Sequence, residues 1–155
     1  MHIILDICAM KNLLDPEDCD RIIGRISKIE PNQQRNFGHM SVLEMLYHCN
    51  KVSQAILTGV STKKPKLKQV FLRILVLNLM QKMPMNRHSS SKYFSKDEHL
   101  SFDIEKKQLI QTTRQYPSNK KPLGGNHPVF GRMNNRQWGR FSWIHLDHHL
   151  RQFGV

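Results

Sequence analysis

The chain has 155 residues, a hydrophobic content of 39% and a formal net charge of +12 at pH 7. This length is typical of a single domain, here residues 1–155, and the apolar residues cluster into helical stripes, which argues against a disordered chain. Three cysteines without a C-x-x-C pair argue against a disulfide framework and favour the reducing cytoplasm.

The positive charge raises the question of a nucleic-acid partner. The lysines include a local cluster at residues 63–68, but no zinc-finger, helix-turn-helix or RNP signature accompanies it. Charge alone indicates only non-specific attraction. We therefore expect a solvated basic surface and no specific nucleic acid. The alternative function is a non-enzymatic helical protein that binds a partner or an anionic polymer through this surface.

No membrane segment is expected. The apolar run at residues 1–7 is interrupted by Asp6 and lacks the basic start of a secretory signal. The longest apolar stretch, residues 70–80, contains Arg73 and Asn78 and is too short to span a bilayer. A soluble intracellular protein is the expectation.

The first predicted helix covers residues 16–29. Asp15 is placed to cap it, Pro16 occupies the first helical position, and Glu17 and Asp18 follow in the first turn. A loop is expected over residues 32–38. The predicted inner face of this helix carries Cys19, Ile22, Ile23 and Ile26.

The second predicted helix starts at a capping box, Ser41 with Glu44, and continues to about residue 57, where Gly59 supplies the stop. His48 lies at the edge of its apolar face, beside Glu44 and Lys51. This is the position of a ligand that faces a partly hydrated pocket. The apolar face itself consists of Val42, Met45, Cys49, Val52 and Ile56.

The middle of the chain, residues 61–91, is basic and rich in methionine. We expect a short accessory helix at its apolar centre and loops on both sides, with Pro84 ending the helix. The apolar centre could cover the other helices or form a dimer face, and the sequence leaves both open.

Two further helices complete the prediction. A capping box at residues 95–98 opens a helix that extends to about residue 116, and a loop rich in glycine and proline follows over residues 117–131. Residues 134–137 cap the last helix, which runs to about residue 153 with Gly154 as its stop. No strand is expected. The fold class is therefore all-α, with four main helices and one shorter accessory helix.

Two histidines of the last helix are candidate metal ligands. His145 and His149 are four residues apart, so their side chains lie about 40° apart around the helix axis and can reach one ion. Hydrogen-bonded core histidines are the alternative, and His148 lies nearer the flank of the helix. Trp138, Phe141 and Gln152 share the inward side, whereas Arg140, Asp147 and Arg151 lie opposite and are expected to face water.

With this pattern of residues, the chain resembles members of the DinB/YfiT-like superfamily of metalloenzymes. That superfamily pairs a histidine of its second helix with an H-x-x-x-H-x-x-Q pattern in its last helix, and the matching residues are His48, His145, His149 and Gln152, with a frequent double histidine at 148–149. Phe-Gly-His-Met-Ser at residues 37–41 and His-Pro-Val-Phe-Gly at 127–131 resemble a branch without an assigned reaction. The match covers nearly the whole chain and is weak only over residues 61–91.

The resemblance implies an up-down-down-up four-helix bundle with His48, His145 and His149 as ligands of one divalent metal ion. Members of the superfamily include thiol-dependent transferases and hydrolase-like enzymes, and many are homodimers. Three neutral imidazoles can bind zinc, nickel or iron, and an open position can activate water or bind a thiolate. We therefore expect a metal-dependent enzyme with a small-molecule substrate, a thiol being one candidate. A purely structural metal between two helices is the remaining alternative.

For some residues near these histidines, more than one role is possible. Glu44 and Gln152 can hold the outer nitrogens of the ligand histidines, although Glu44 can equally be a capping residue. His127 can approach the open position, but we favour a loop residue packed under Phe130. Cys49 points into the core and is expected to act as a small hydrophobic residue.

Overall fold

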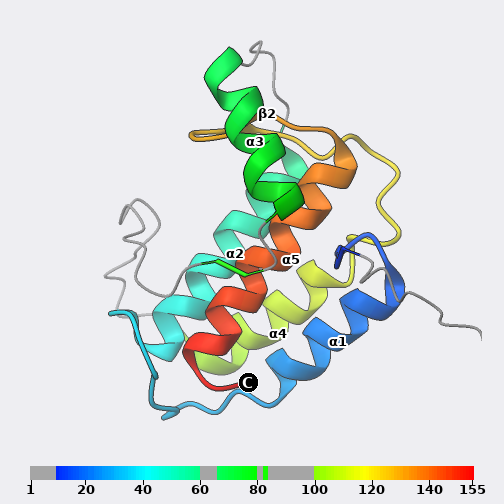
Figure 1. The fold of residues 1–155 in the computed structure, drawn as a ribbon. Coiled ribbons are helices and arrows are strands. Elements are labelled where there is room, and N and C mark those ends of the chain that lie inside the picture. Colours follow the sequence, from blue (N-terminus) through cyan, green and yellow to red (C-terminus); the bar gives the residue numbers. More distant parts are fainter. Residues whose placement is uncertain (1–9, 60–65, 80–81, 84–99) are drawn as a thin grey trace, which may run out of the picture.

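A computed structural model of the protein describes residues 10–59, 66–79, 82–83 and 100–155. This part of the chain is mostly helical, with five helices and one small antiparallel sheet of two strands (Figure 1). The elements are α1 (Pro16–Ser27), α2 (Val42–Thr58), α3 (Leu67–Leu79), α4 (Phe102–Thr113), β1 (Asn126–His127), β2 (Gly131–Arg132) and α5 (Asn135–Gln152).

The starts of three helices follow the predicted caps. The Asp15 carboxylate accepts hydrogen bonds from the backbone N–H groups of Glu17 and Asp18 at the start of α1. Reciprocal capping boxes join Ser41 to Glu44 in α2 and Asn134 to Gln137 in α5. Local side chains thus define these starts, because each satisfies N–H groups that have no partner within the helix.

The fourth helix begins later than predicted. A continuous helix over residues 95–116 is wrong, because Leu100 and Ser101 are not helical and turns replace the helix after Thr113. Ser101 is extended, with φ −107° and ψ 127°, and makes no side-chain capping bond. The capping box predicted at residues 95–98 lies outside the described residues.

The prediction of no strand is also wrong, on a small scale. Asn126 pairs with Arg132 and His127 with Gly131 in an antiparallel hairpin whose two strands are each two residues long. The His127 ring stabilises the intervening turn, since its Nδ1 accepts the N–H groups of Val129 at 3.1 Å and Phe130 at 3.2 Å. A hairpin this short has no alternating hydrophobic pattern, so the sequence offers no strand signal.

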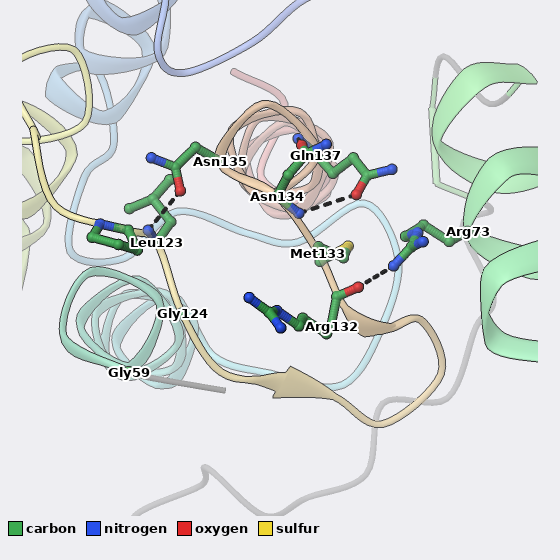
Figure 2. A pocket seen from close by; sticks show the side chains of 10 residues that line it. Gly59, Arg73, Leu123, Gly124, Arg132, Met133, Asn134, Asn135 and Gln137 are labelled. Atoms are coloured by element: carbon green, nitrogen blue, oxygen red, sulfur yellow. Dashed lines mark hydrogen bonds between the residues drawn. The ribbon is translucent and has the colours of Figure 1, made fainter. Parts of the chain in front are cut away.

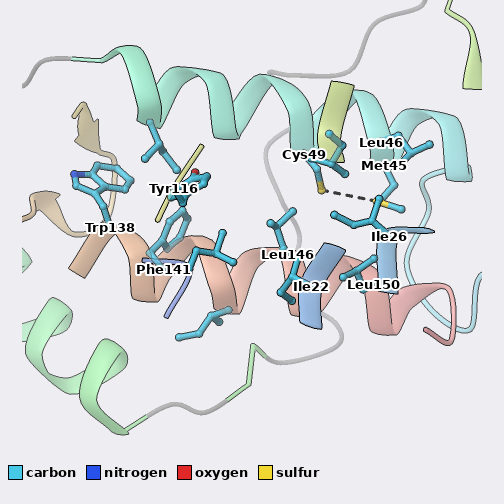
Figure 3. Packing of buried hydrophobic residues seen from close by; sticks show 14 of the residues in the cluster. Ile22, Ile26, Met45, Leu46, Cys49, Tyr116, Trp138, Phe141, Leu146 and Leu150 are labelled. Carbon is cyan, nitrogen blue, oxygen red and sulfur yellow. Dashed lines mark hydrogen bonds between the residues drawn. The ribbon is translucent and has the colours of Figure 1, made fainter. Parts of the chain in front are cut away.

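Four helices surround the main core. α4 packs against α1 and α2, and α5 packs against the same two helices from the other side (Figure 1). Apolar side chains fill the space between them, and Figure 3 shows Cys49 and Met45 of α2 facing Leu146 and Leu150 of α5. This pairing of α2 with α5 brings together the two helices that carry the candidate ligands.

The accessory helix α3 packs mainly against α5 and has two different sides. Leu77 is buried, and Leu72 and Val76 are packed against the core. Hence one side of α3 covers the core. The other side is exposed and apolar, and it carries Leu67, Phe71, Ile74 and Leu75.

The expectation that one side of α5 faces water is wrong. Asp147 and Arg140 are only 4% and 5% exposed. Asp147 accepts from Arg25 of α1 at 2.8 Å and from Arg151 at 2.9 Å, while Arg140 donates to the Lys11 carbonyl oxygen at 2.9 Å. α1 and the segment before it therefore cover this side, and paired hydrogen bonds make burial of its charges tolerable.

Within the described residues, no helix combines the length and the apolar character that crossing a membrane requires.

Candidate metal centre

Three imidazoles meet between α2 and α5. His48 comes from α2, and His145 and His149 come from successive turns of α5. All three are buried, and their candidate ligand nitrogens lie within 4.8 Å of one another. The Nε2 atoms of His48 and His145 are 3.1 Å apart, and the His149 ring centroid lies 4.9 Å and 4.7 Å from those of His48 and His145.

The spacing of these nitrogens suits a single metal ion. Histidine nitrogens lie about 2.0–2.1 Å from zinc, so two of them at a tetrahedral ion are roughly 3.3 Å apart. The 3.1 Å between His48 and His145 is close to this value. No carboxylate or thiolate of the described residues joins the cluster, and three protein ligands leave a coordination position open.

Burial keeps these rings in the protonation state that metals require. It lowers the pKa of His48 to about 4, with a smaller contribution from His148. It lowers the pKa of His149 to about 3, with a further contribution from His48, and brings the pKa of His145 well below its ordinary value. The three imidazoles are therefore neutral at pH 7, and neutral imidazole is the form that ligates metal ions.

A hydrogen bond sets the orientation of His149. Its Nδ1 lies 2.9 Å from Oε1 of Gln152, one turn further along α5. When Nδ1–H donates to this oxygen, Nε2 is left unprotonated and free to ligate. Gln152 therefore lies where the sequence predicted a partner. Glu44 instead accepts from the Ser41 backbone N–H at 2.7 Å and serves as a capping residue.

Gln152 is itself held by the loop between α1 and α2. The Asn36 N–H donates to the Gln152 carbonyl oxygen at 2.7 Å. Gly38 has φ +82°, and a Cβ at this position would lie 1.9 Å from the Gln152 side-chain nitrogen. Sequence reasoning did not assign Gly38 a role, although the glycine stands within the 37–41 motif. Only the tertiary contact reveals why a side chain is excluded there.

Comparison with known families identifies the group to which the chain is related. The model of the family DUF1569, a family of proteins of unknown function, matches residues 9–154. The chain belongs to the DUF1569 family. No match was found among curated proteins or among solved structures.

The other histidines of this DUF1569 protein near the centre have different surroundings. His148 is buried beside the cluster, with its ring centroid 5.1 Å from that of His149 and 5.5 Å from that of Phe37. It is not one of the three clustered ligands, in agreement with its position on the helix flank. His127 stacks on Phe130 at 4.5 Å, as the favoured interpretation expected, and it also lines the cavity next to the cluster.

Neither described cysteine of this DUF1569 protein, Cys19 or Cys49, belongs to the histidine cluster. Cys49 is buried, and its Sγ lies 3.8 Å from the Met45 sulfur. Burial raises the pKa of the Cys49 thiol above its ordinary range and that of Cys19 to about 11. Both are free thiols that remain protonated, as expected of hydrophobic core residues. Cys8 lies outside the described residues.

Two cavities flank α5. One, of about 550 Å³, has the three clustered histidines in its wall. The other, of about 710 Å³, lies at the start of α5 and contains Arg73 and Arg132, and Figure 2 shows the Arg73 guanidinium donating to the Arg132 carbonyl oxygen. The basic segment proposed as an alternative partner site, residues 61–91, is described over residues 66–79 and 82–83 in this DUF1569 protein.

Proposed function

We propose that this DUF1569 protein is a divalent-metal-dependent enzyme whose ligands are His48, His145 and His149. The observation that carries the proposal is a cluster of three buried, neutral imidazoles in the wall of a cavity. Structural zinc sites are almost always closed by four protein ligands. A three-ligand cluster facing a cavity therefore favours a catalytic role over a purely structural one.

At such a site the metal ion and the surrounding residues would have different roles. A divalent ion held there would supply Lewis-acid chemistry, lowering the pKa of a bound water to about 7 or holding a thiolate. Gln152 orients His149 through the 2.9 Å hydrogen bond to Nδ1. Apolar side chains, among them Val52, Ile56 and Phe141, line the cavity around the cluster.

We further propose that α1, α2, α4 and α5 form the up-down-down-up four-helix bundle of the DinB/YfiT-like superfamily. The mutual packing of these helices supports this assignment, as does the placement of His48 on α2 and of His145, His149 and Gln152 on α5. Under this affiliation the enzyme is a cytoplasmic homodimer that acts as a transferase or hydrolase. Its substrate is a small molecule, with a thiol as the first candidate, and its metal is zinc, nickel or iron.

Metal content tests the ligand assignment. Mass spectrometry on tag-free protein should find about one divalent ion per chain in the wild type and little in His145→Ala or His149→Ala. His39→Ala, which removes an exposed loop histidine, is the matched control and should keep the metal. Retention of the metal by both ligand variants would overturn the proposal.

The open position needs a separate measurement. Cobalt(II) substituted for the native ion reports its coordination through its visible absorption. Addition of a small thiol should shift this spectrum, because the thiolate enters the position that protein ligands leave open. A spectrum that no thiol or small anion alters would indicate a closed, structural site, and chelation should then greatly reduce the melting temperature.

A further inference from the structure

Several parts of the chain build the cavity beside the histidine cluster. α2 contributes Val52 and Ile56, α3 contributes Val76, and α5 contributes Trp138 and Phe141. The segment around the hairpin, residues 124–130, closes another side. Its volume of about 550 Å³ lies within the range of about 300–1,000 Å³ that small-molecule sites occupy.

The lining of this cavity carries no formal charge among the described residues. It contains no Asp, Glu, Lys or Arg, although the chain as a whole has a net charge of +12. An ionised group placed there without a partner would lose its hydration at high cost. A ligand whose body carries a carboxylate, phosphate or ammonium group is therefore disfavoured away from the metal.

Aromatic rings form one continuous wall of the cavity. The Phe141 ring is nearly parallel to the His145 ring, at 5.7 Å and 20°. The rings of Phe141 and His127 meet edge to face at 4.7 Å. Trp138 meets Phe141 at 5.8 Å and 85°, and Figure 3 shows these two side chains. Flat rings pack favourably against such faces and edges.

The geometry of His127 keeps this wall neutral. Its Nδ1 accepts two backbone N–H groups, from Val129 and Phe130, so this nitrogen carries no proton. The ring is then the uncharged tautomer with its proton on Nε2. His127 thus adds aromatic surface to the cavity and no positive charge.

We infer that the cavity binds an uncharged, ring-bearing small molecule, whose polar head reaches the three-histidine centre while its ring packs against Phe141, His127 and Trp138. This inference rests on the proposed metal site and adds the chemistry of the substrate body. Among thiols, it selects aromatic or cyclic compounds over thiol conjugates that carry several charges.

Three hydroxamates that share one metal-binding head can test the inference on the zinc-loaded full chain. Isothermal titration should compare acetohydroxamate, benzohydroxamate and the monohydroxamate of succinate. We expect benzohydroxamate to bind at least about tenfold more tightly than acetohydroxamate, because its ring becomes buried. The carboxylate of the succinate compound should give no gain over acetohydroxamate.

Two bulky substitutions locate the ring. Ala55→Trp and Val52→Trp each place an indole at a cavity-lining position of α2, and one of them should reduce the preference for benzohydroxamate to less than about threefold. Gln54→Trp puts the same bulk on an exposed position of α2 outside the cavity and should leave the preference unchanged. Two different positions are used because an indole at the exposed residue 55 can turn toward solvent.

The outcomes separate this inference from the proposed function. Equal affinity of all three hydroxamates for the zinc-loaded wild type would overturn the inference and leave the metal site intact. A ring preference that survives both indole variants would place the ring elsewhere and would also overturn it. Failure of the wild type to retain zinc would instead overturn the proposed function, and the inference with it.

Discussion

The side-chain amide of Gln152 lies between the His149 ring and the backbone of Gly38. Its Oε1 is 2.9 Å from His149 Nδ1, and a Cβ at Gly38 would fall 1.9 Å from its nitrogen. A loop residue is thereby connected, through one amide, to a candidate metal ligand more than a hundred positions away. The orientation of the His149 ring depends on this contact between Gly38, the Gln152 amide and the imidazole, since neither helix alone fixes the rotation of the ring.

Gly38→Ala should weaken both metal retention and the fold. The new methyl group would displace the Gln152 amide, and φ +82° is unfavourable for alanine. We expect a loss of about 1–3 kcal/mol in the free energy of unfolding, measured with urea, and weaker zinc binding in competition with a chelator. Gly24→Ala is the control, because a Cβ there meets no atom within 4 Å and alanine favours a helix. Unchanged zinc affinity in Gly38→Ala would show that the contact between Gly38 and the Gln152 amide does not orient His149.

Gln152 should act through its acceptor oxygen. Gln152→Leu removes the acceptor from His149 and is expected to reduce metal affinity by about 10–100-fold, whereas Gln152→Glu keeps an acceptor at the same place and should retain most of it. Chelator competition at pH 7.5 measures both variants. Equal affinities of Gln152→Leu and the wild type would show that packing alone orients the ring.

The buried carboxylate of Asp147 should matter more for stability than any exposed one. Asp147→Asn would leave Arg25 and Arg151 without their shared anion, at a cost of roughly 2–4 kcal/mol in the free energy of unfolding. Glu17→Gln, which breaks the exposed pair with Arg21, should change stability by less than about 1 kcal/mol. Urea denaturation compares the two. Similar effects from both would mean that burial adds nothing to the Asp147 network.

The metal-free protein should lose stability in mild acid. Burial lowers the pKa of His48 to about 4 and that of His149 to about 3, whereas unfolded histidines titrate near pH 6.5. The unfolded chain therefore binds more protons between these values. This contribution to stability is complete above about pH 6.5 and is lost as the pH falls toward 4.

Urea midpoints at pH 7.5, 6 and 5 measure this dependence. We expect a loss of roughly 1–2 kcal/mol per buried histidine between pH 7.5 and pH 5. His48→Gln should flatten the decrease, while His39→Asn, at an exposed loop position, should leave it as steep as in the wild type. A midpoint that does not change with pH would argue against neutral, buried rings.

Local chemistry in the sequence was sufficient for the starts of α1, α2 and α5 and for the two candidate ligands that α5 carries. Asp15, the Ser41–Glu44 box and the Asn134–Gln137 box satisfy N–H groups only a few residues away, so their effect can be read without a fold. The same holds for His145, His149 and Gln152, because helical periodicity places residues three and four apart on one side.

The tertiary structure decided everything that depends on which surfaces meet. His48 reaches His145 across 97 positions only because α2 packs against α5, and the side of α5 with Asp147 and Arg140 is buried only because α1 and the segment before it cover it. The role of Gly38 and the neutral lining of the cavity likewise arise from contacts between distant segments. Periodicity along one helix reports which residues share a side, whereas the partner that covers a side is set by the packing of the whole chain.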